Sequence, residues 1–129
     1  MTGEPDLEAR FRAMIDAYSA NDRAAIRALL ADDIVAYITN ADAGVDRVDG
    51  ADAYMGRLPD VSGVEYSVSV RQSVTVAADR VLAMVEVKAA RNGRSLHNHA
   101  AFLSRFVDGR IAELWMVDAL PSYSDEFWS

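Results

Sequence analysis

Two turn sequences, Asn92-Gly93 and Asp108-Gly109, constrain the fold more than any other feature of the chain. Asn-Gly and Asp-Gly pairs favour the tight turns that join neighbouring antiparallel strands. Each pair stands between runs rich in apolar and β-branched residues. They predict three consecutive strands, over residues 81–90, 95–106 and 111–118. Apolar and polar residues also alternate over residues 64–71, which predicts a further half-buried strand before them and therefore an antiparallel meander.

The N-terminal half follows a helical period instead. Phe11 and Tyr18 fall on one apolar face at helical spacing, and Pro5 suits the first turn of that helix. Asn21 or Asp22 is typical of the N-cap of a second helix. The chain is therefore expected to begin with a helical hairpin.

A strand, a loop and a short helix connect this hairpin to the meander. Residues 34–39 are short and β-branched, which predicts a strand. Residues 40–50 are rich in Asp, Asn and Gly and predict a loop, whereas residues 51–57 predict a short helix that Pro59 ends. Helices followed by antiparallel strands indicate one α+β domain over residues 1–129, with the helices on one face of a curved sheet.

Composition excludes several classes of function. The chain has no Cys and only two His, so thiol nucleophiles, iron–sulfur clusters, disulfides and three-His metal sites are ruled out. Its 20 Asp and Glu against 13 Lys and Arg argue against a nucleic-acid partner, which needs clustered basic residues. No apolar run approaches the roughly 20 residues that span a bilayer, and residues 1–12 lack the pattern of a signal peptide. We expect a cytoplasmic protein with no membrane partner.

A resemblance to a known family is carried by three segments: NDRAAIRALLADDIVAYIT (residues 21–39), VDGADAY (48–54) and SRFVDGRIAELWMVDA (104–119). They resemble the nuclear transport factor 2-like superfamily, and within it the SnoaL-like and ketosteroid isomerase branches. The resemblance implies a cone-shaped α+β fold, in which the first helices and a strongly curved, mixed or antiparallel sheet enclose an apolar pocket. It also implies a homodimer.

The same resemblance implies where catalytic residues would stand. The oxyanion-donating Tyr of ketosteroid isomerase falls on Met14, its general-base Asp on Ile38, and the partner Asp near Phe102. Since these three positions are apolar, steroid-type enolisation by that constellation is not expected. The Asp that SnoaL-like cyclases and limonene epoxide hydrolases use falls near Met116, two residues before Asp118.

Asp118 is the preferred candidate for a catalytic acid or base. It ends the apolar run Leu114-Trp115-Met116-Val117, where a carboxyl group would be partly desolvated. Alternation along a strand places Asp118 on the same face as Met116. The alternative is that Asp118 only caps the segment after the last strand or pairs with an arginine.

His97 and His99 form a His-x-His pair on a predicted strand, so both imidazoles project to one side. That spacing suits a metal ion with a carboxylate as third ligand. However, if Phe102 and Asn98 face the pocket, both imidazoles point to the other face, which would be a dimer or solvent surface. We therefore expect no resident metal or cofactor, and a single histidine, His99, as the better candidate for moving a proton or orienting the substrate.

Tyrosines suit a pocket for a partly polar ligand, because each offers an apolar ring and a hydroxyl group. Tyr18, on the apolar face of the first helix, is the best placed to orient a substrate. The side chains expected to bind substrate are Met14, Tyr37, Ile38, Tyr54, Asn98, Phe102, Trp115 and Met116. Phe127 and Trp128 lie in the tail PSYSDEFWS. We expect them to pack over the pocket mouth or against a partner subunit. The alternative is that they only close the edge of the domain.

Two hypotheses for function follow. The first is a cofactor-independent SnoaL-like enzyme that performs isomerase, cyclase or epoxide hydrolase chemistry on a small apolar molecule, with Asp118 as acid or base and His99 or Tyr18 orienting the substrate. The second is a non-catalytic protein that binds an apolar ligand, which the apolar residues at the family's catalytic positions favour.

Overall fold

The computed structural model describes residues 6–129, and Pro5, the predicted first helical position, lies outside them. Helix α1 (Leu7–Ser19) begins after Asp6, whose carboxylate accepts a hydrogen bond from the backbone N–H of Ala9. Helix α2 (Arg23–Ala28) begins in the same way after Asp22. Side-chain oxygens at these N-caps satisfy backbone N–H groups that have no partner inside the helix. The predicted helical hairpin is confirmed.

The strands are β1 (Leu30–Thr39), β2 (Val45–Asp49), β3 (Glu65–Ala77), β4 (Arg80–Arg91), β5 (Arg94–Val107) and β6 (Arg110–Asp118). They form one sheet in the order β2-β1-β6-β5-β4-β3. The meander from β3 to β6 is antiparallel, as predicted, and both Asn92-Gly93 and Asp108-Gly109 have the positive φ angles of tight hairpin turns. Because β1 pairs with β6 in parallel, the sheet is mixed.

The loop predicted over residues 40–50 is wrong, because it contains β2. This strand lies at the edge of the sheet, and only Val48 among its residues is buried. An edge strand with one buried side chain has no apolar alternation that sequence patterns would detect. Its structure comes from antiparallel pairing with β1, in which Ile38 stands opposite Asp46.

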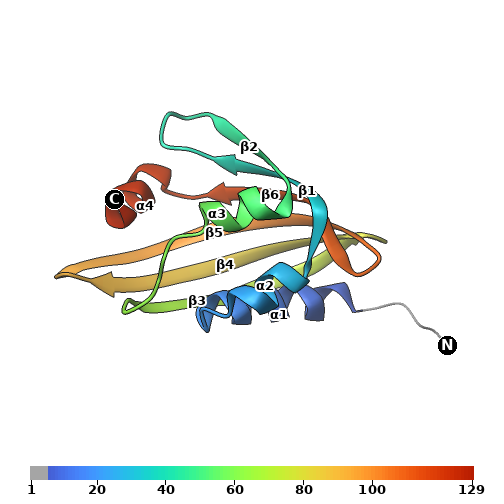
Figure 1. Ribbon diagram of the computed structural model, residues 1–129, viewed down its shortest axis with the longest axis horizontal. Helices are drawn as coiled ribbons and strands as arrows, with labels where there is room; N and C mark the ends of the chain where they lie inside the picture. Colours follow the sequence, from blue (N-terminus) through green and yellow to red (C-terminus); the bar gives the residue numbers. More distant parts are fainter. Residues whose placement is uncertain (1–5) are drawn as a thin grey trace.

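Two short helices complete the fold. Helix α3 (Ala51–Arg57) has the predicted bounds, and helix α4 (Pro121–Trp128) begins with a proline, which suits a first helical turn. In Figure 1, α4 lies at the end of the sheet opposite to the start of α1, beside the β4–β5 hairpin. The tail is therefore a helix docked on the sheet.

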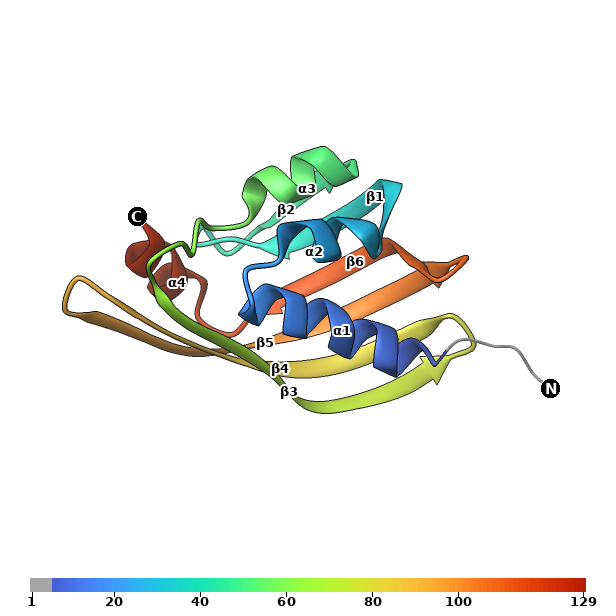
Figure 2. The same ribbon diagram turned by 60° about the horizontal axis from the view of Figure 1, so that its bottom comes forward.

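Helices α1 and α2 lie against one face of the curved sheet, which we call the inner face (Figure 2). Phe11 of α1 packs on Phe102 of β5 with ring centroids 5.5 Å apart, and both belong to the main core. Ser19 Oγ accepts a hydrogen bond from the backbone N–H of Val68 at 2.8 Å, which connects the end of α1 to β3. The predicted α+β cone is confirmed. Within residues 6–129, no helix is long and apolar enough to cross a membrane.

Candidate functional site

The inner face and the helices border a cavity of about 230 Å³, which is smaller than the roughly 300–1,000 Å³ of pockets for drug-sized ligands. All four helices and every strand except β2 contribute to its lining. Ala100 of β5 stands opposite Val85 of β4 and Asp118 of β6. A small side chain between two larger ones leaves room above the sheet, so the cavity follows from the pairing of these strands.

One wall of the cavity is an apolar row across three strands. Ile38, Met116 and Phe102 stand side by side on β1, β6 and β5 because the strand registers pair them. All three border the cavity, where the sequence analysis placed them. A ligand against this wall would meet hydrocarbon and thioether groups and no charged side chain.

Two tyrosine hydroxyl groups meet at another wall. The hydroxyl oxygens of Tyr18 on α1 and Tyr54 on α3 lie 2.5 Å apart, and both residues border the cavity. One hydroxyl donates to the other, and neither has a further hydrogen-bond partner among residues 6–129. Since each tyrosine carries one O–H donor, one proton of the pair is left to donate to a ligand.

Burial keeps these tyrosines neutral. Removal from water raises the pKa of Tyr54 to about 12 and raises the pKa of Tyr18 well above its ordinary value of 10.0, where the neighbouring Tyr54 adds to the effect. Burial also raises the pKa of Tyr66, on the adjoining wall, to about 12. At neutral pH the pair therefore acts as a hydrogen-bond donor and not as a base.

Asp118 borders the cavity at the end of β6, and its carboxylate is already engaged. Oδ1 accepts hydrogen bonds from the side-chain amide of Asn98 at 2.6 Å and from the backbone N–H of Leu120 at 2.8 Å. The second bond is the capping role that the sequence analysis gave as the alternative. Oδ2 has no hydrogen-bond partner among residues 6–129, so this oxygen is available to a ligand.

Asn98 holds this corner of the pocket together. It is 4% exposed, and its amide nitrogen also donates to Ser124 Oγ on α4 at 2.9 Å. Its side-chain oxygen accepts the backbone N–H of His99 at 2.8 Å. A buried amide is costly unless it is hydrogen-bonded, and here both ends are. Asn98 thereby connects β5, the end of β6 and α4.

The two aromatic residues of the tail, Phe127 and Trp128, lie in different surroundings. Trp128 borders the cavity and meets Tyr66 edge to face, with ring centroids 5.9 Å apart. Phe127 is 3% exposed and packs with Ala89 and Leu96 in a small second core. Trp128 thus lies at the wall of the pocket, and Phe127 packs at the edge of the domain.

Three of the residues expected at the pocket lie elsewhere. Met14 is 0% exposed in the main core and does not border the cavity. Tyr37 and Trp115 stack on the other face of the sheet, which we call the outer face, with ring centroids 5.6 Å apart. Their positions follow from strand geometry, because neighbouring residues in a strand project to opposite faces and Ile38 and Met116 take the inner face.

The imidazole of His99 points to the outer face for the same reason, as alternation along the strand predicted. It follows Asn98 in β5, and although it borders the cavity, its imidazole lies on the outer face with Nε2 3.7 Å from Glu86 Oε2. His97 lies there too, and its Nε2 donates to the same oxygen at 2.8 Å. This hydrogen bond lowers the pKa of Glu86, with smaller effects from Lys88 and other charges. An imidazole on the outer face cannot touch a ligand in the pocket.

Sequence reasoning did not name several residues that border the cavity. They are Asn21, Arg23, Ile26, Thr39, Arg57, Leu58, Pro59, Val61, Tyr66, Val68, Val85, Val87, Leu96, Ala100, Pro121, Ser124 and Asp125. The alternation over residues 64–71 marked Tyr66 and Val68 as inward-facing, and it was the available signal for the β3 wall. Nothing in the local pattern marks residues 58–61 or Ser124, because their position depends on how the loop after α3 and helix α4 dock.

The fold and its largely apolar cavity define a class of α+β cones with an enclosed pocket. The sequence from residue 11 to residue 114 matches the SnoaL-like domain family. The chain therefore belongs to the SnoaL-like family, within the nuclear transport factor 2-like superfamily. A search of curated proteins finds no match.

Solved structures share this architecture. Bal32a, from a soil-derived mobile gene cassette, has a TM-score of 0.78 at 17% identity, covering 95% of this chain and 96% of its own. An LEH-like epoxide hydrolase from Mycobacterium tuberculosis has a TM-score of 0.73 at 18% identity, covering 92% and 86%. Another M. tuberculosis protein, in complex with estradiol-17beta-hemisuccinate, has a TM-score of 0.71 at 17% identity, covering 88% and 93%. At these identities the similarity concerns the fold.

The raised pKa of Tyr54 predicts a loss of stability in alkali. Unfolded tyrosine ionises near pH 10, whereas Tyr54 in the folded protein ionises near 12. Between these values the unfolded chain binds fewer protons, so the free energy of unfolding falls as pH rises. Replacing Tyr54→Phe should reduce that slope by up to about 1.4 kcal/mol per pH unit, measured by urea unfolding from pH 9 to 12. An equal slope in both proteins would contradict the assignment.

Proposed function

We propose that this chain binds a small, largely apolar molecule that carries an oxygen acceptor such as a carbonyl group. The observation that carries the proposal is the O–H group of the Tyr18 and Tyr54 pair that has no acceptor among residues 6–129. A buried donor without a partner costs about 1–3 kcal/mol, which a ligand oxygen would recover. The apolar row of Ile38, Met116 and Phe102 would take the hydrocarbon part of the ligand.

A similar structure supports a small organic molecule as the ligand. The M. tuberculosis protein of the same fold is in complex with a steroid derivative, estradiol-17beta-hemisuccinate. The cavity of about 230 Å³ here favours a smaller ligand. It suits a molecule of one or two rings, with its oxygen on the tyrosine pair.

A matched pair of ligands tests this proposal. 1-Tetralone and its parent hydrocarbon tetralin differ in the carbonyl oxygen, so the hydrogen bond should favour the ketone in wild-type protein. Either tyrosine alone could still donate, so both must be changed. The double variant Tyr18→Phe/Tyr54→Phe should bind tetralone about tenfold more weakly and tetralin equally well, because a hydrogen bond contributes about 0.5–1.5 kcal/mol.

Protein-observed NMR titration gives both dissociation constants. Tyr37→Phe is the matched control, because Tyr37 stacks on Trp115 at the outer face and does not border the cavity. If the double variant still binds the ketone more tightly than the hydrocarbon, the tyrosine pair does not donate a hydrogen bond to the ligand oxygen.

A second candidate function is acid–base catalysis by Asp118. It is favoured by the free Oδ2 atom at the cavity, while Oδ1 is held by Asn98 and the backbone of Leu120. In this proposal Oδ2 takes a proton from carbon next to the ligand carbonyl. The tyrosine pair then donates to the oxygen on which negative charge develops. Isomerase and cyclase reactions share this step, and epoxide opening uses the same groups as base and donor.

Exchange of the α-protons of bound 1-tetralone in D₂O tests this step. Wild-type protein at saturating ligand should accelerate exchange by about 10²- to 10⁴-fold over buffer, and Asp118→Asn should remove most of this acceleration. The amide keeps an oxygen that can accept the Leu120 N–H, so the fold should be retained. Tetralone that binds wild-type protein without faster exchange would favour the purely binding function.

We also propose a homodimer formed through the outer face. Leu82, Met84 and Val117 are 42%, 43% and 51% exposed there, and the register places Leu82 in one row with Leu103, Trp115 and Tyr37. An exposed apolar sheet face of this kind is typical of an interface between proteins. The dimer is separate from the pocket on the inner face.

Light scattering after gel filtration measures the oligomeric state. Wild-type protein should have the mass of two chains. The Leu82→Glu variant should have the mass of one chain, because dimerisation would bury the new carboxylate in the interface. Leu120→Glu is the matched control, since Leu120 is also exposed, at 54%, but lies outside the sheet. A monomeric wild-type protein would overturn this proposal.

A further inference from the structure

Three side chains that can bind a metal ion converge on the outer face. The pairing of β4 and β5 places Glu86 directly opposite His99. His97 stands two residues before His99 in β5 and therefore projects to the same face. Directly opposite residues in an antiparallel pair have Cβ atoms about 4.5–5.5 Å apart, and diagonal neighbours remain within reach of long side chains. The backbone itself therefore brings these three groups together.

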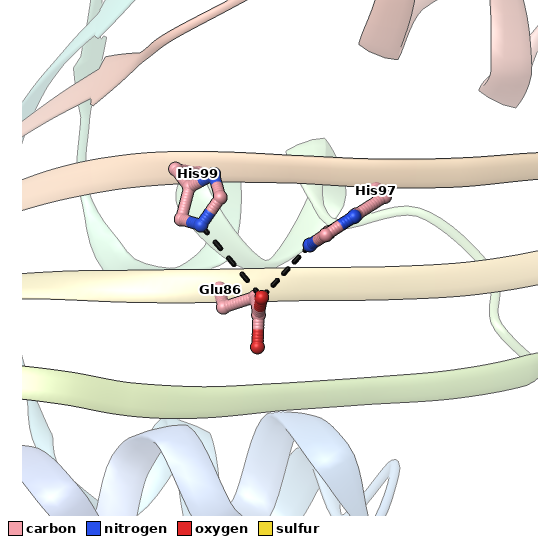
Figure 3. Close-up of side chains that lie close together, drawn as sticks. All are labelled: Glu86, His97 and His99. Carbon is pink, nitrogen blue, oxygen red and sulfur yellow. Dashed lines mark hydrogen bonds and ion pairs between the residues drawn. The ribbon is translucent and has the colours of Figure 1, made fainter.

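The donor atoms are close to the spacing that a metal ion needs. His97 Nε2 lies 2.8 Å and His99 Nε2 3.7 Å from Glu86 Oε2, and one ligand atom from each residue lies within 4.8 Å of the others. Figure 3 shows both imidazoles reaching from β5 over β4 toward the carboxylate. Two ligands of a tetrahedral ion with bonds of about 2.0–2.2 Å are roughly 3.3 Å apart. Small movements of side chains would therefore complete the site.

A simple ion pair accounts for only part of this arrangement. The hydrogen bond from His97 satisfies one imidazole, but the ring of His99 approaches the same oxygen without a hydrogen bond among residues 6–129. The competing positive charges are Lys88, whose Nζ lies 4.0 Å from Oε1, the other carboxylate oxygen, and Arg71, whose effect on the carboxylate is weaker. Lys88 is 61% exposed and free to swing away, so it does not block the two imidazoles.

We propose that Glu86, His97 and His99 form a binding site for a divalent transition-metal ion of the zinc class. Two imidazoles and one carboxylate suit Zn²⁺, Co²⁺, Ni²⁺ and Cu²⁺, whereas Mg²⁺ and Ca²⁺ prefer sites made of oxygen alone. The imidazoles are 57% and 47% exposed, so the remaining coordination positions are open to water or to a side chain from a second chain. Because the imidazoles lie on the outer face, this site is separate from the pocket and does not depend on the proposed ligand, and it shares that face with the proposed dimer.

The composition of the chain excludes other imidazole or thiol ligands from the binding test. His97 and His99 are the only histidines and there is no cysteine, so a protein without a purification tag offers no other imidazole or thiol ligand. Calorimetric titration with ZnCl₂ at pH 7.5 should show a dissociation constant of about 10 µM or tighter. An excess of MgCl₂ should not compete.

Variants distinguish Zn²⁺ binding at this site from weak Zn²⁺ binding by the acidic surface. His99→Ala and Glu86→Gln should each weaken Zn²⁺ binding by about 100-fold or more, because loss of an outer partner alone costs about 10- to 100-fold. Lys88→Gln is the matched control, since it removes a neighbouring charge and no ligand, and it should bind at least as tightly as wild type. Circular dichroism verifies that the substitutions leave the fold unchanged.

Each outcome decides the proposal. One Zn²⁺ per chain, or one per two chains if two copies share the ion, supports it when His99→Ala and Glu86→Gln lose binding. Wild-type binding weaker than about 1 mM, or equal binding by wild type and His99→Ala, overturns it. In that case the three residues form a surface ion pair only.

Discussion

The register between β4 and β5 is the constraint on which both faces of this protein depend. Residues that pair directly in an antiparallel ladder project to the same face. Val85 therefore stands with Ala100 on the inner face, and Glu86 stands with His99 on the outer face. A slip of one residue would exchange the two faces completely. The turn at Asn92-Gly93 opposes such a slip, because its positive φ angles fit a tight hairpin.

The pocket depends on a division of roles between the sheet and the helices. The sheet provides apolar side chains and, at Ala100, a small one that leaves space. The helices provide the hydroxyl groups of Tyr18 and Tyr54, and the Asn98–Asp118 corner is braced by α4. A few fixed polar groups among apolar walls orient a ligand without excluding it, which is the usual design of a small-molecule site.

Sequence reasoning succeeded where one segment carries its own signal. The helical hairpin and the meander follow from local period, and the inward direction of Asn98, Phe102 and Met116 follows from the family resemblance together with strand alternation. It failed for β2, whose edge position gives no alternation, and for the helical form of the tail. It also failed for Tyr37 and Trp115, which were assigned to the pocket as aromatic residues although their neighbours in the strand already faced inward.

The amino-acid sequence by itself determined the α+β class, the family and the alternation that separates inner from outer residues. These features arise within short stretches, whose turns and periods reflect the geometry of their own backbone. Only the tertiary structure decided that Tyr18 meets Tyr54, and that Glu86 lies beside both histidines. Such contacts join residues far apart in the chain, and they exist because strand pairing and helix packing fix the relative positions of whole elements.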